Sequence, residues 1–200
     1  MRLDGQKIAV LMESDFYEPE ILYYQRRFPE EGAETHFLTR LWGNKQITFR
    51  GHEHGMPFTV DESFEDVDEY GLREFSAVIV PSGIVADRLR YTEDLAVLPP
   101  ATEFLRRAFD DPNIIKGIIC HGMWLAASIP DVIRDRHAVV HNNLFGDFGN
   151  MGGVYVDKDV VIDGDLITAR TGDHCHLFAR AIIDHLAERT EIRQTRHYGA

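Results

Sequence analysis

The chain has 200 residues, of which 44% are hydrophobic and 27% charged, and its formal net charge is -12. These values are typical of a soluble globular protein with a sizeable core, and the acidic balance argues against a nucleic-acid binder. No stretch approaches the ~18 consecutive apolar residues of a membrane span, and the N-terminus lacks the apolar region of a signal peptide. We therefore expect a cytoplasmic protein with no membrane partner, in which both cysteines are free thiols.

The first half of the chain alternates between strand and helix patterns. Lys7 to Met12 is a short apolar run typical of a buried strand, and a helix follows from about Pro19 to Glu31. Thr35 to Thr39 is the next strand, which completes a strand–helix–strand unit. The segment from Trp42 to Glu69 is irregular and punctuated by glycines. Ser76 to Pro81 is a further buried strand, so a parallel sheet is predicted.

The next segments continue this alternation. We expect a helix from Thr92 to Phe109, broken or kinked at Pro99-Pro100, and then a strand from Ile114 to Ile119. A helix from His121 to Ser128 follows directly. Four short runs are predicted as strands, with the turn signal Asp163-Gly164 between the last two: His137–Val140, Gly153–Val156, Val160–Ile162 and Leu166–Thr168.

The C-terminal segment carries a helical stripe of apolar residues from Asp173 to Glu188, and the polar tail 190–200 is expected to be loosely held. No repeat or linker is visible. We therefore predict a single domain over 1–200, with a core of about 7–188. Its predicted class is α/β, with a mostly parallel central sheet.

Cys120 lies where an apolar strand runs straight into a helix. Such a junction holds a side chain on a sharp turn above the sheet, and Gly122 permits the turn. The nearby helix N-terminus should stabilise a thiolate, and backbone N–H groups should be placed to hold an oxyanion. The alternative is that Cys120 is only a small buried hydrophobe. The complete strand–Cys-His-Gly–helix pattern favours a nucleophile elbow.

The stretch Ile119-Cys120-His121-Gly122 resembles the signature of the ThiJ/PfpI family, within the class I glutamine amidotransferase-like superfamily. Three further stretches are similar in order and spacing: Asp15–Glu20, Val80–Gly83 and Val161–Arg170. The resemblance covers about Lys7 to Leu186. It implies a flavodoxin-like three-layer sandwich, self-association as a dimer or higher oligomer, and no obligatory organic cofactor.

The resemblance also implies an acid beside the thiol. Glu18 is the predicted partner, although counting back from the helix end places Tyr17 at that position. As an alternative, Glu18 is simply a charge that complements the helix N-terminus. The predicted oxyanion hole consists of the N–H groups of Gly83 and His121, since Ser82 replaces a glycine of the family.

His121 is implied as a catalytic residue that pairs with an acid of a neighbouring chain. The corresponding acid here is Asp87, which is shorter than the usual Glu and could equally be a surface charge. Asp15, His141 and His174 are expected to face the substrate as hydrogen-bonding or acid–base groups.

The histidines near the C-terminal end of the chain are a departure from the family pattern. We expect no metal, because none of them has a self-sufficient ligand spacing. Should the pocket hold zinc, the candidate ligands are His174, His176 and His141.

Three functions are consistent with these residues. The favoured one is an enzyme in which Cys120 forms a covalent thio-intermediate with a small carbonyl-like or amide-like substrate, as a hydrolase, hydratase or glyoxalase-like lyase. The alternatives are a redox-sensing stress-response protein with an oxidisable Cys120, and a metal-dependent lyase or hydrolase that uses the extra histidines.

Overall fold

A seven-stranded sheet forms the centre of the protein, in a computed structural model that describes residues 1–198. Its strand order is β10-β11-β7-β6-β1-β2-β5, and every neighbouring pair is parallel except the hairpin of β10 and β11. The strands are β1 (Lys7–Leu11), β2 (Glu34–Thr39), β5 (Glu62–Ser63), β6 (Phe75–Val80), β7 (Ile115–Ile119), β10 (Val160–Asp163) and β11 (Leu166–Ala169).

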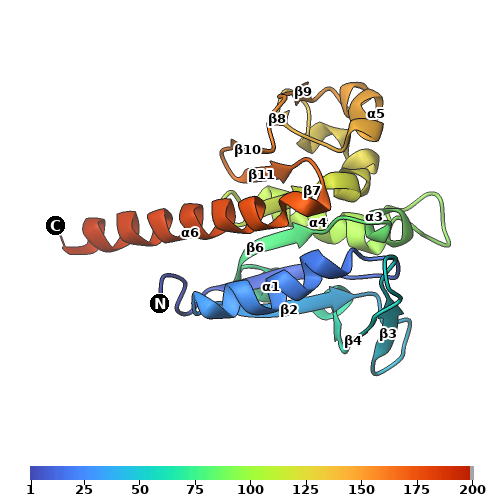
Figure 1. The fold of residues 1–200 in the computed structure, drawn as a ribbon, viewed down its shortest axis with the longest axis horizontal. Helices are drawn as coiled ribbons and strands as arrows, with labels where there is room; N and C mark the ends of the chain where they lie inside the picture. The colour runs from blue at the N-terminus through green and yellow to red at the C-terminus, as the bar shows by residue number, and fades with distance from the viewer. Residues whose placement is uncertain (199–200) are drawn as a thin grey trace.

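Helices cover both faces of this sheet (Figure 1). Helices α1 and α6 lie side by side on one face and α4 lies on the other. The α-helices are α1 (Glu18–Glu30), α2 (Glu69–Leu72), α3 (Val85–Leu89), α4 (Pro100–Asp110), α5 (Phe145–Asn150) and α6 (Cys175–Tyr198). This arrangement confirms the predicted α/β sandwich with a mostly parallel sheet.

Two small sheets lie outside the central one. Strands β3 (Ile47–Arg50) and β4 (Pro57–Val60) form an antiparallel pair within the segment predicted to be irregular. Strands β8 (His137–Ala138) and β9 (Val154–Tyr155) form a short parallel pair. In Figure 1, β3 and β4 lie at the lower right of the view and β8 and β9 at its top, outside the layers formed by the central sheet and its helices.

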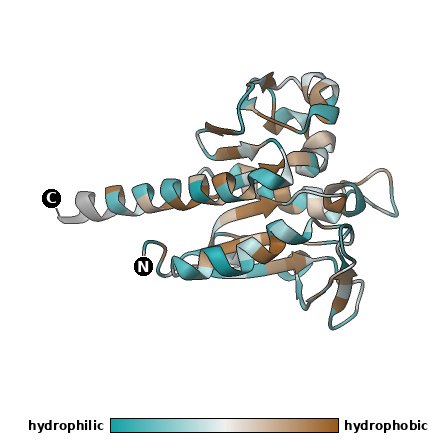
Figure 2. Ribbon diagram, viewed as in Figure 1, coloured by the Kyte–Doolittle hydropathy of each residue, from teal (hydrophilic) through white to brown (hydrophobic). Residues whose placement is uncertain are grey.

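The core lies between the sheet and its helices, where Figure 2 shows hydrophobic colour concentrated on the central strands. All five residues of β7 are buried. A Cβ at Gly117 would lie 2.8 Å from Phe178 of α6, so the glycine allows that helix to pack closely on the strand. This tight packing keeps β7, the strand that directly precedes Cys120, rigid.

Two helix predictions need correction. The helix expected from Thr92 begins only at Pro100, because Pro99 has an extended backbone and Pro100 is favoured at the first helical position. The helix predicted to end at Glu188 is longer, since α6 continues to Tyr198. Among the described residues, no helix has the length and apolar composition needed to cross a membrane.

Candidate active site

A pocket of about 520 Å3 opens at the carboxyl ends of the central strands. Ligands of open parallel sheets bind at this edge. The pocket is lined by segments that follow six different strands, β1, β3, β6, β7, β8 and β11. The lining residues are Asp15, Tyr17, His52, Glu53, Ser82, Gly83, Ile84, Cys120, His121, His141, Thr171, Gly172 and Asp173.

Cys120 stands at the base of the pocket on a strained turn. Its φ is +59°, in the left-handed region that non-glycine residues rarely adopt. Strand β7 ends at Ile119, and a 3-10 helix rather than the expected α-helix runs from Cys120 to Ser128. A Cβ at Gly122 would lie 2.6 Å from the carbonyl oxygen of Val80, so this turn requires glycine.

The Cys120 thiol is protonated at neutral pH. Burial raises its pKa to about 11, and the charge of Glu20 acts in the same direction. The backbone N–H groups of His121, Gly172 and Gly83 lower the pKa but do not outweigh burial. The direction of this shift is opposite to the one expected from the helix N-terminus, because desolvation is the larger effect.

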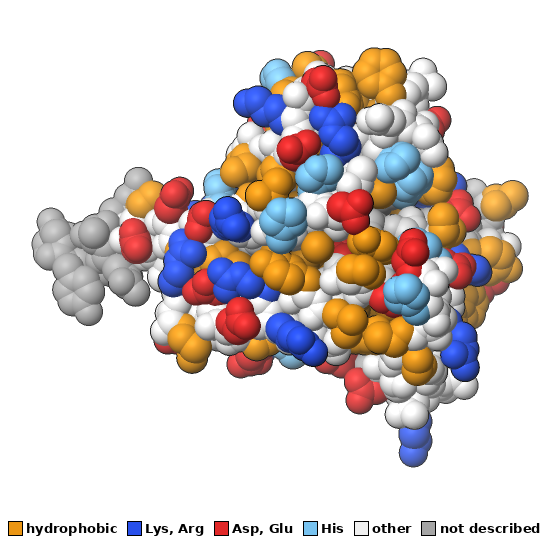
Figure 3. Space-filling view, viewed as in Figure 1, with side chains coloured by type: hydrophobic (Ala, Val, Ile, Leu, Met, Phe, Trp, Pro, Cys, Tyr) orange, Lys and Arg blue, Asp and Glu red, His pale blue; other side chains and the backbone are white. Residues whose placement is uncertain are grey.

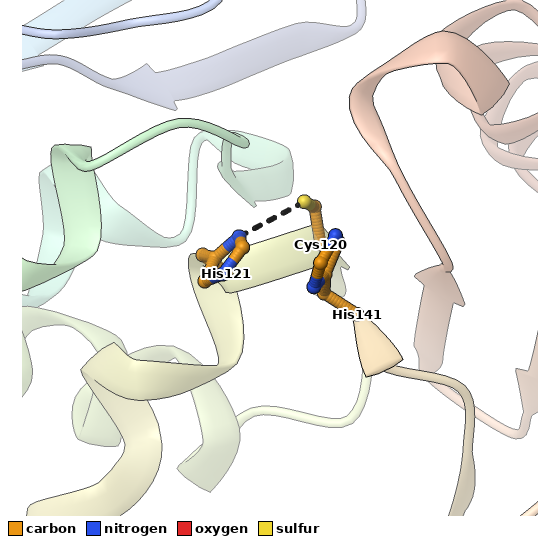
Figure 4. Close-up of side chains that lie close together, drawn as sticks. All are labelled: Cys120, His121 and His141. Atoms are coloured by element: carbon orange, nitrogen blue, oxygen red, sulfur yellow. Dashed lines mark hydrogen bonds between the residues drawn. The ribbon is translucent and has the colours of Figure 1, made fainter. Parts of the chain in front are cut away.

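His121 can take the thiol proton. Its Nδ1 lies 3.2 Å from the Cys120 Sγ, as the dashed line in Figure 4 shows. Burial and the neighbouring His141 lower the pKa of His121 below its ordinary value of 6.5, so the ring is neutral at pH 7. The ring also packs against Trp124 and His141, with centroids 4.9 and 4.3 Å away. A neutral imidazole held beside a protonated thiol is the arrangement of a general base.

Glu18 is not beside the thiol. Its carboxylate accepts hydrogen bonds from the backbone N–H groups of Glu53, His54 and Met56, at 3.0, 2.8 and 3.4 Å. Burial acts to raise the pKa of Glu18, but these bonds outweigh it and lower the pKa to about 2. Glu18 therefore anchors the β3–β4 connection, and the predicted contact with Cys120 is absent.

The acid that influences the thiol is Glu20, which the sequence analysis missed. Its side chain is fully buried and accepts hydrogen bonds from the N–H of Ser82, at 3.0 Å, and from the Ser82 hydroxyl. Burial raises the pKa of Glu20 to about 7. A signal was available in the sequence, since Glu20 is spaced four and eight residues from Tyr24 and Phe28, on the buried face of α1.

Tyr17 and Asp15 both line the pocket. The Tyr17 hydroxyl donates to Asp173 at 2.6 Å, and its ring stacks on His52. The hydrogen bond to Asp173 raises the pKa of Tyr17 to about 12, so the phenol keeps its proton. Asp15 forms an ion pair with Arg88. The rim is thus held by side-chain contacts between distant loops.

Three backbone N–H groups face the thiol. Two of them, from Gly83 and His121, belong to the predicted oxyanion hole, and the third, from Gly172, was not predicted. Gly83 has a φ of +82°, and a Cβ there would clash with the carbonyl oxygen of Asp15. A Cβ at Gly172 would lie 2.7 Å from the Ser82 hydroxyl oxygen. Both glycines are needed for the backbone to approach the sulfur.

The other predicted site residues, His174, His176 and Asp87, are not among the residues that line the pocket. His174 contacts Thr171 through Nδ1, at 2.8 Å, and Asp159 through Nε2, at 3.4 Å. His176 is exposed, and its Nδ1 contacts the carbonyl oxygen of Asp173. Asp87 forms an ion pair with Arg90 on the protein surface.

One group of side chains in the described part of the chain has the composition and spacing of a metal site. It consists of Cys120, His121 and His141, whose ligand atoms all lie within 4.8 Å of one another. His141 is the only member shared with the predicted zinc candidates. The three side chains come together from the ends of two strand–loop segments (Figure 4).

One face of the molecule carries side chains of all types. In Figure 3, acidic, basic and histidine side chains are intermixed with hydrophobic ones, and no broad basic patch is visible among the described residues on this face.

Comparison with known proteins identifies relatives along most of the chain. The model of the DJ-1/PfpI family matches residues 6–185. General stress protein 18 of Bacillus subtilis is 32% identical over 177 residues, covering 88% of this chain and 95% of the relative. Protein/nucleic acid deglycase 2 of Escherichia coli is 32% identical over 179 residues, covering 88% and 95%.

Solved structures share the fold at lower identity. A ThiJ/PfpI domain protein from Brachyspira murdochii superposes with a TM-score of 0.76 at 20% identity, covering 92% of this chain and 98% of that protein. Drosophila melanogaster DJ-1beta gives a TM-score of 0.76 at 18% identity, with 97% of each chain covered. At these identities the likeness establishes the fold alone.

Proposed function

The chain belongs to the DJ-1/PfpI family, and from this premise we propose that it is a cysteine-dependent enzyme acting on a small carbonyl-like or amide-like substrate. The observation that carries the proposal is the 3.2 Å contact between Cys120 Sγ and His121 Nδ1 at the base of an open pocket. Some relatives are named deglycases, and this name supports adducts between amines and reactive carbonyls as the substrate class.

The first step pairs proton transfer with attack. The thiol proton of Cys120 passes to His121 Nδ1 while the sulfur bonds to the carbonyl carbon. A thiol of high pKa can react in this way, because its proton leaves while the sulfur bonds to the carbonyl carbon and no free thiolate has to accumulate. The carbonyl π electrons move to oxygen, and the N–H groups of Gly83, Gly172 and His121 are the donors proposed to stabilise this oxyanion.

Release of the amine and hydrolysis complete the turnover for an amide-like substrate. The oxyanion collapses, the carbon–nitrogen bond breaks, and the departing amine takes the proton held by His121. The acyl group remains on Cys120 as a thioester. Water then attacks the thioester, with His121 as base, and releases the acid with a regenerated thiol.

The elevated pKa of the Cys120 thiol favours the proposed enzymatic function over the alternative function of a redox sensor. Peroxide reacts with thiolates, and redox-sensing cysteines have low pKa values and exposed sulfurs. Cys120 is 7% exposed and burial raises its pKa to about 11. The geometry therefore favours chemistry in which a neighbouring base removes the proton during attack.

The test compares Cys120→Ala and His121→Asn with wild-type protein and with His137→Asn, a control histidine whose side chain is 60% exposed. The readouts are consumption of methylglyoxal, release of free amine from a methylglyoxal-treated peptide, and cleavage of a chromogenic amide. We expect Cys120→Ala to abolish turnover and His121→Asn to reduce it by about 10²–10⁴-fold. Undiminished turnover in Cys120→Ala would refute the proposal.

A further inference from the structure

We propose that the pocket binds one Zn²⁺ ion through Cys120, His121 and His141, and that the bound ion reversibly blocks the thiol. This inference goes beyond the proposed enzymatic function, since it assigns to the same pocket an inhibitory metal site. It rests on the convergence of one sulfur and two imidazole rings from separate loops (Figure 4).

The spacing of the three side chains suits a tetrahedral ion. The three ligand atoms lie within 4.8 Å of one another, so a central ion would be at most about 2.8 Å from each, whereas zinc sites have distances of about 2.0–2.3 Å. Small rotations of the side chains would close this difference. One pair, the Sγ of Cys120 and the Nδ1 of His121, is already 3.2 Å apart.

The donor types also suit zinc. A thiolate with two imidazoles is a ligand set used by zinc enzymes that leave a fourth position open. Cys120 is buried, and both histidines are partly exposed to the pocket, so an ion can enter from solvent. Binding replaces the thiol proton, which leaves to solvent, and both imidazoles coordinate in the neutral form.

His141 must give up one hydrogen bond to coordinate the ion. Its Nδ1 accepts from the N–H of Asn143 at 3.2 Å. Coordination through Nδ1 removes this acceptor directly, and coordination through Nε2 places the ring proton on Nδ1. The cost is one long neutral hydrogen bond at the surface, which is small beside a new bond to a metal.

Other histidines around the pocket already have partners at both ring nitrogens. His52 contacts the carbonyl oxygen of Asp15 through Nδ1 and Glu53 through Nε2, at 3.2 and 3.0 Å. His174 is held in the same way by Thr171 and Asp159. Because these contacts occupy His52 and His174, His141 is the histidine that we assign as the third ligand beside Cys120 and His121.

The consequence is inhibition that a chelator reverses. The sulfur electron pair needed for attack is the pair that binds the ion, and the Nδ1 of His121 needed as base is adjacent to it. An enzyme carrying Zn²⁺ in this position therefore cannot begin the proposed reaction.

The experiment uses the full chain after removal of metal with a chelator. Calorimetric titration with Zn²⁺ should give one site per chain in the wild-type protein, and His141→Ala should bind at least tenfold more weakly. His137→Ala, in which an exposed histidine is removed, should keep the wild-type affinity. Far-ultraviolet circular dichroism and melting curves check that each variant is folded.

Cobalt gives a second readout that identifies the sulfur ligand. Co²⁺ should produce a thiolate-to-metal charge-transfer band in the wild-type protein, and this band should be absent from Cys120→Ala. Absence of Zn²⁺ binding, or equal affinity in wild-type and His141→Ala proteins, would overturn the inference. If metal binding fails while turnover still depends on Cys120, the proposed function stands without it; if Zn²⁺ binds as expected but Cys120→Ala keeps full turnover, only the proposed function fails.

Discussion

Replacing Glu20 by Gln should remove a pH-dependent loss of stability that this buried carboxyl causes. Glu20 is fully buried, and burial raises its pKa from the ordinary 4.5 to about 7. Glutamine has the same shape as the protonated acid and can still accept from the N–H and hydroxyl of Ser82. The substitution therefore reproduces the neutral form of the group at every pH.

The direction of this pH dependence follows from the pKa of Glu20 in the folded protein and in the unfolded chain. Below pH 4.5 Glu20 is protonated in both folded and unfolded protein, so its contribution is fully present there. Between pH 4.5 and 7 the unfolded chain loses this proton while the folded protein keeps it, and stability falls as the pH rises. For these two pKa values the loss between pH 5 and 8 is about 2.5 kcal/mol.

The assay is urea unfolding of wild-type and Glu20→Gln proteins at pH 5, 6, 7 and 8, followed by circular dichroism. The free energy of unfolding of Glu20→Gln minus that of the wild-type protein should increase by about 2.5 kcal/mol from pH 5 to pH 8. Glu18→Gln is the matched control, because the pKa of Glu18 is about 2 and its difference from wild type should stay constant over this range. A constant difference for Glu20→Gln as well would refute the reasoning.

Three shorter predictions concern the backbone, the rim and the base. Gly83→Ala should destabilise the protein by about 1–3 kcal/mol and lower turnover, because φ is +82° and the new Cβ would clash with the carbonyl oxygen of Asp15. Denaturant unfolding measures the loss of stability, and steady-state kinetics measures the loss of turnover. Tyr17→Phe should cost about 0.5–1.5 kcal/mol through loss of the hydrogen bond to Asp173, and an unchanged melting temperature would contradict this. The kcat/KM should rise with pH through an inflection below 6.5, where His121 becomes neutral, and the inflection should be absent from any residual activity of His121→Asn.

The sheet was predictable because its strands are buried on both faces. Lys7–Leu11 and Ile115–Ile119 are short runs made almost entirely of apolar residues, and such runs require a parallel sheet covered by helices. Helix ends were less predictable. The sequence pattern from Thr92 to Pro99 is compatible with a helix, but this segment folds into turns and bends, and α4 begins only at Pro100. Where α6 ends also could not be read from composition, because a polar helix and a polar coil look alike.

The site was predictable where local backbone geometry defines it. Cys120 and Gly83 each follow an apolar strand; the strand-to-helix junction indicated the role of Cys120, and the family resemblance implied that of Gly83. Gly172 was missed because it approaches the sulfur from the distant loop after β11, whose position depends on tertiary packing. The metal-like group was predicted only in part: His141 was among the candidate ligands, but its approach to Cys120 and His121 depends on the packing of a separate segment.

The helical period explains why the acid was assigned to the wrong glutamate. Glu18 and Glu20 are two residues apart, and a helix turns by about 100° per residue, so their side chains point in nearly opposite directions. Glu20 is on the buried face with Tyr24, and Glu18 must therefore point to the β3–β4 connection, where backbone N–H groups keep it ionised. The burial that places Glu20 near the sulfur also favours its neutral form. Because Glu20 favours its neutral form, His121 remains the base that we propose for removal of the thiol proton.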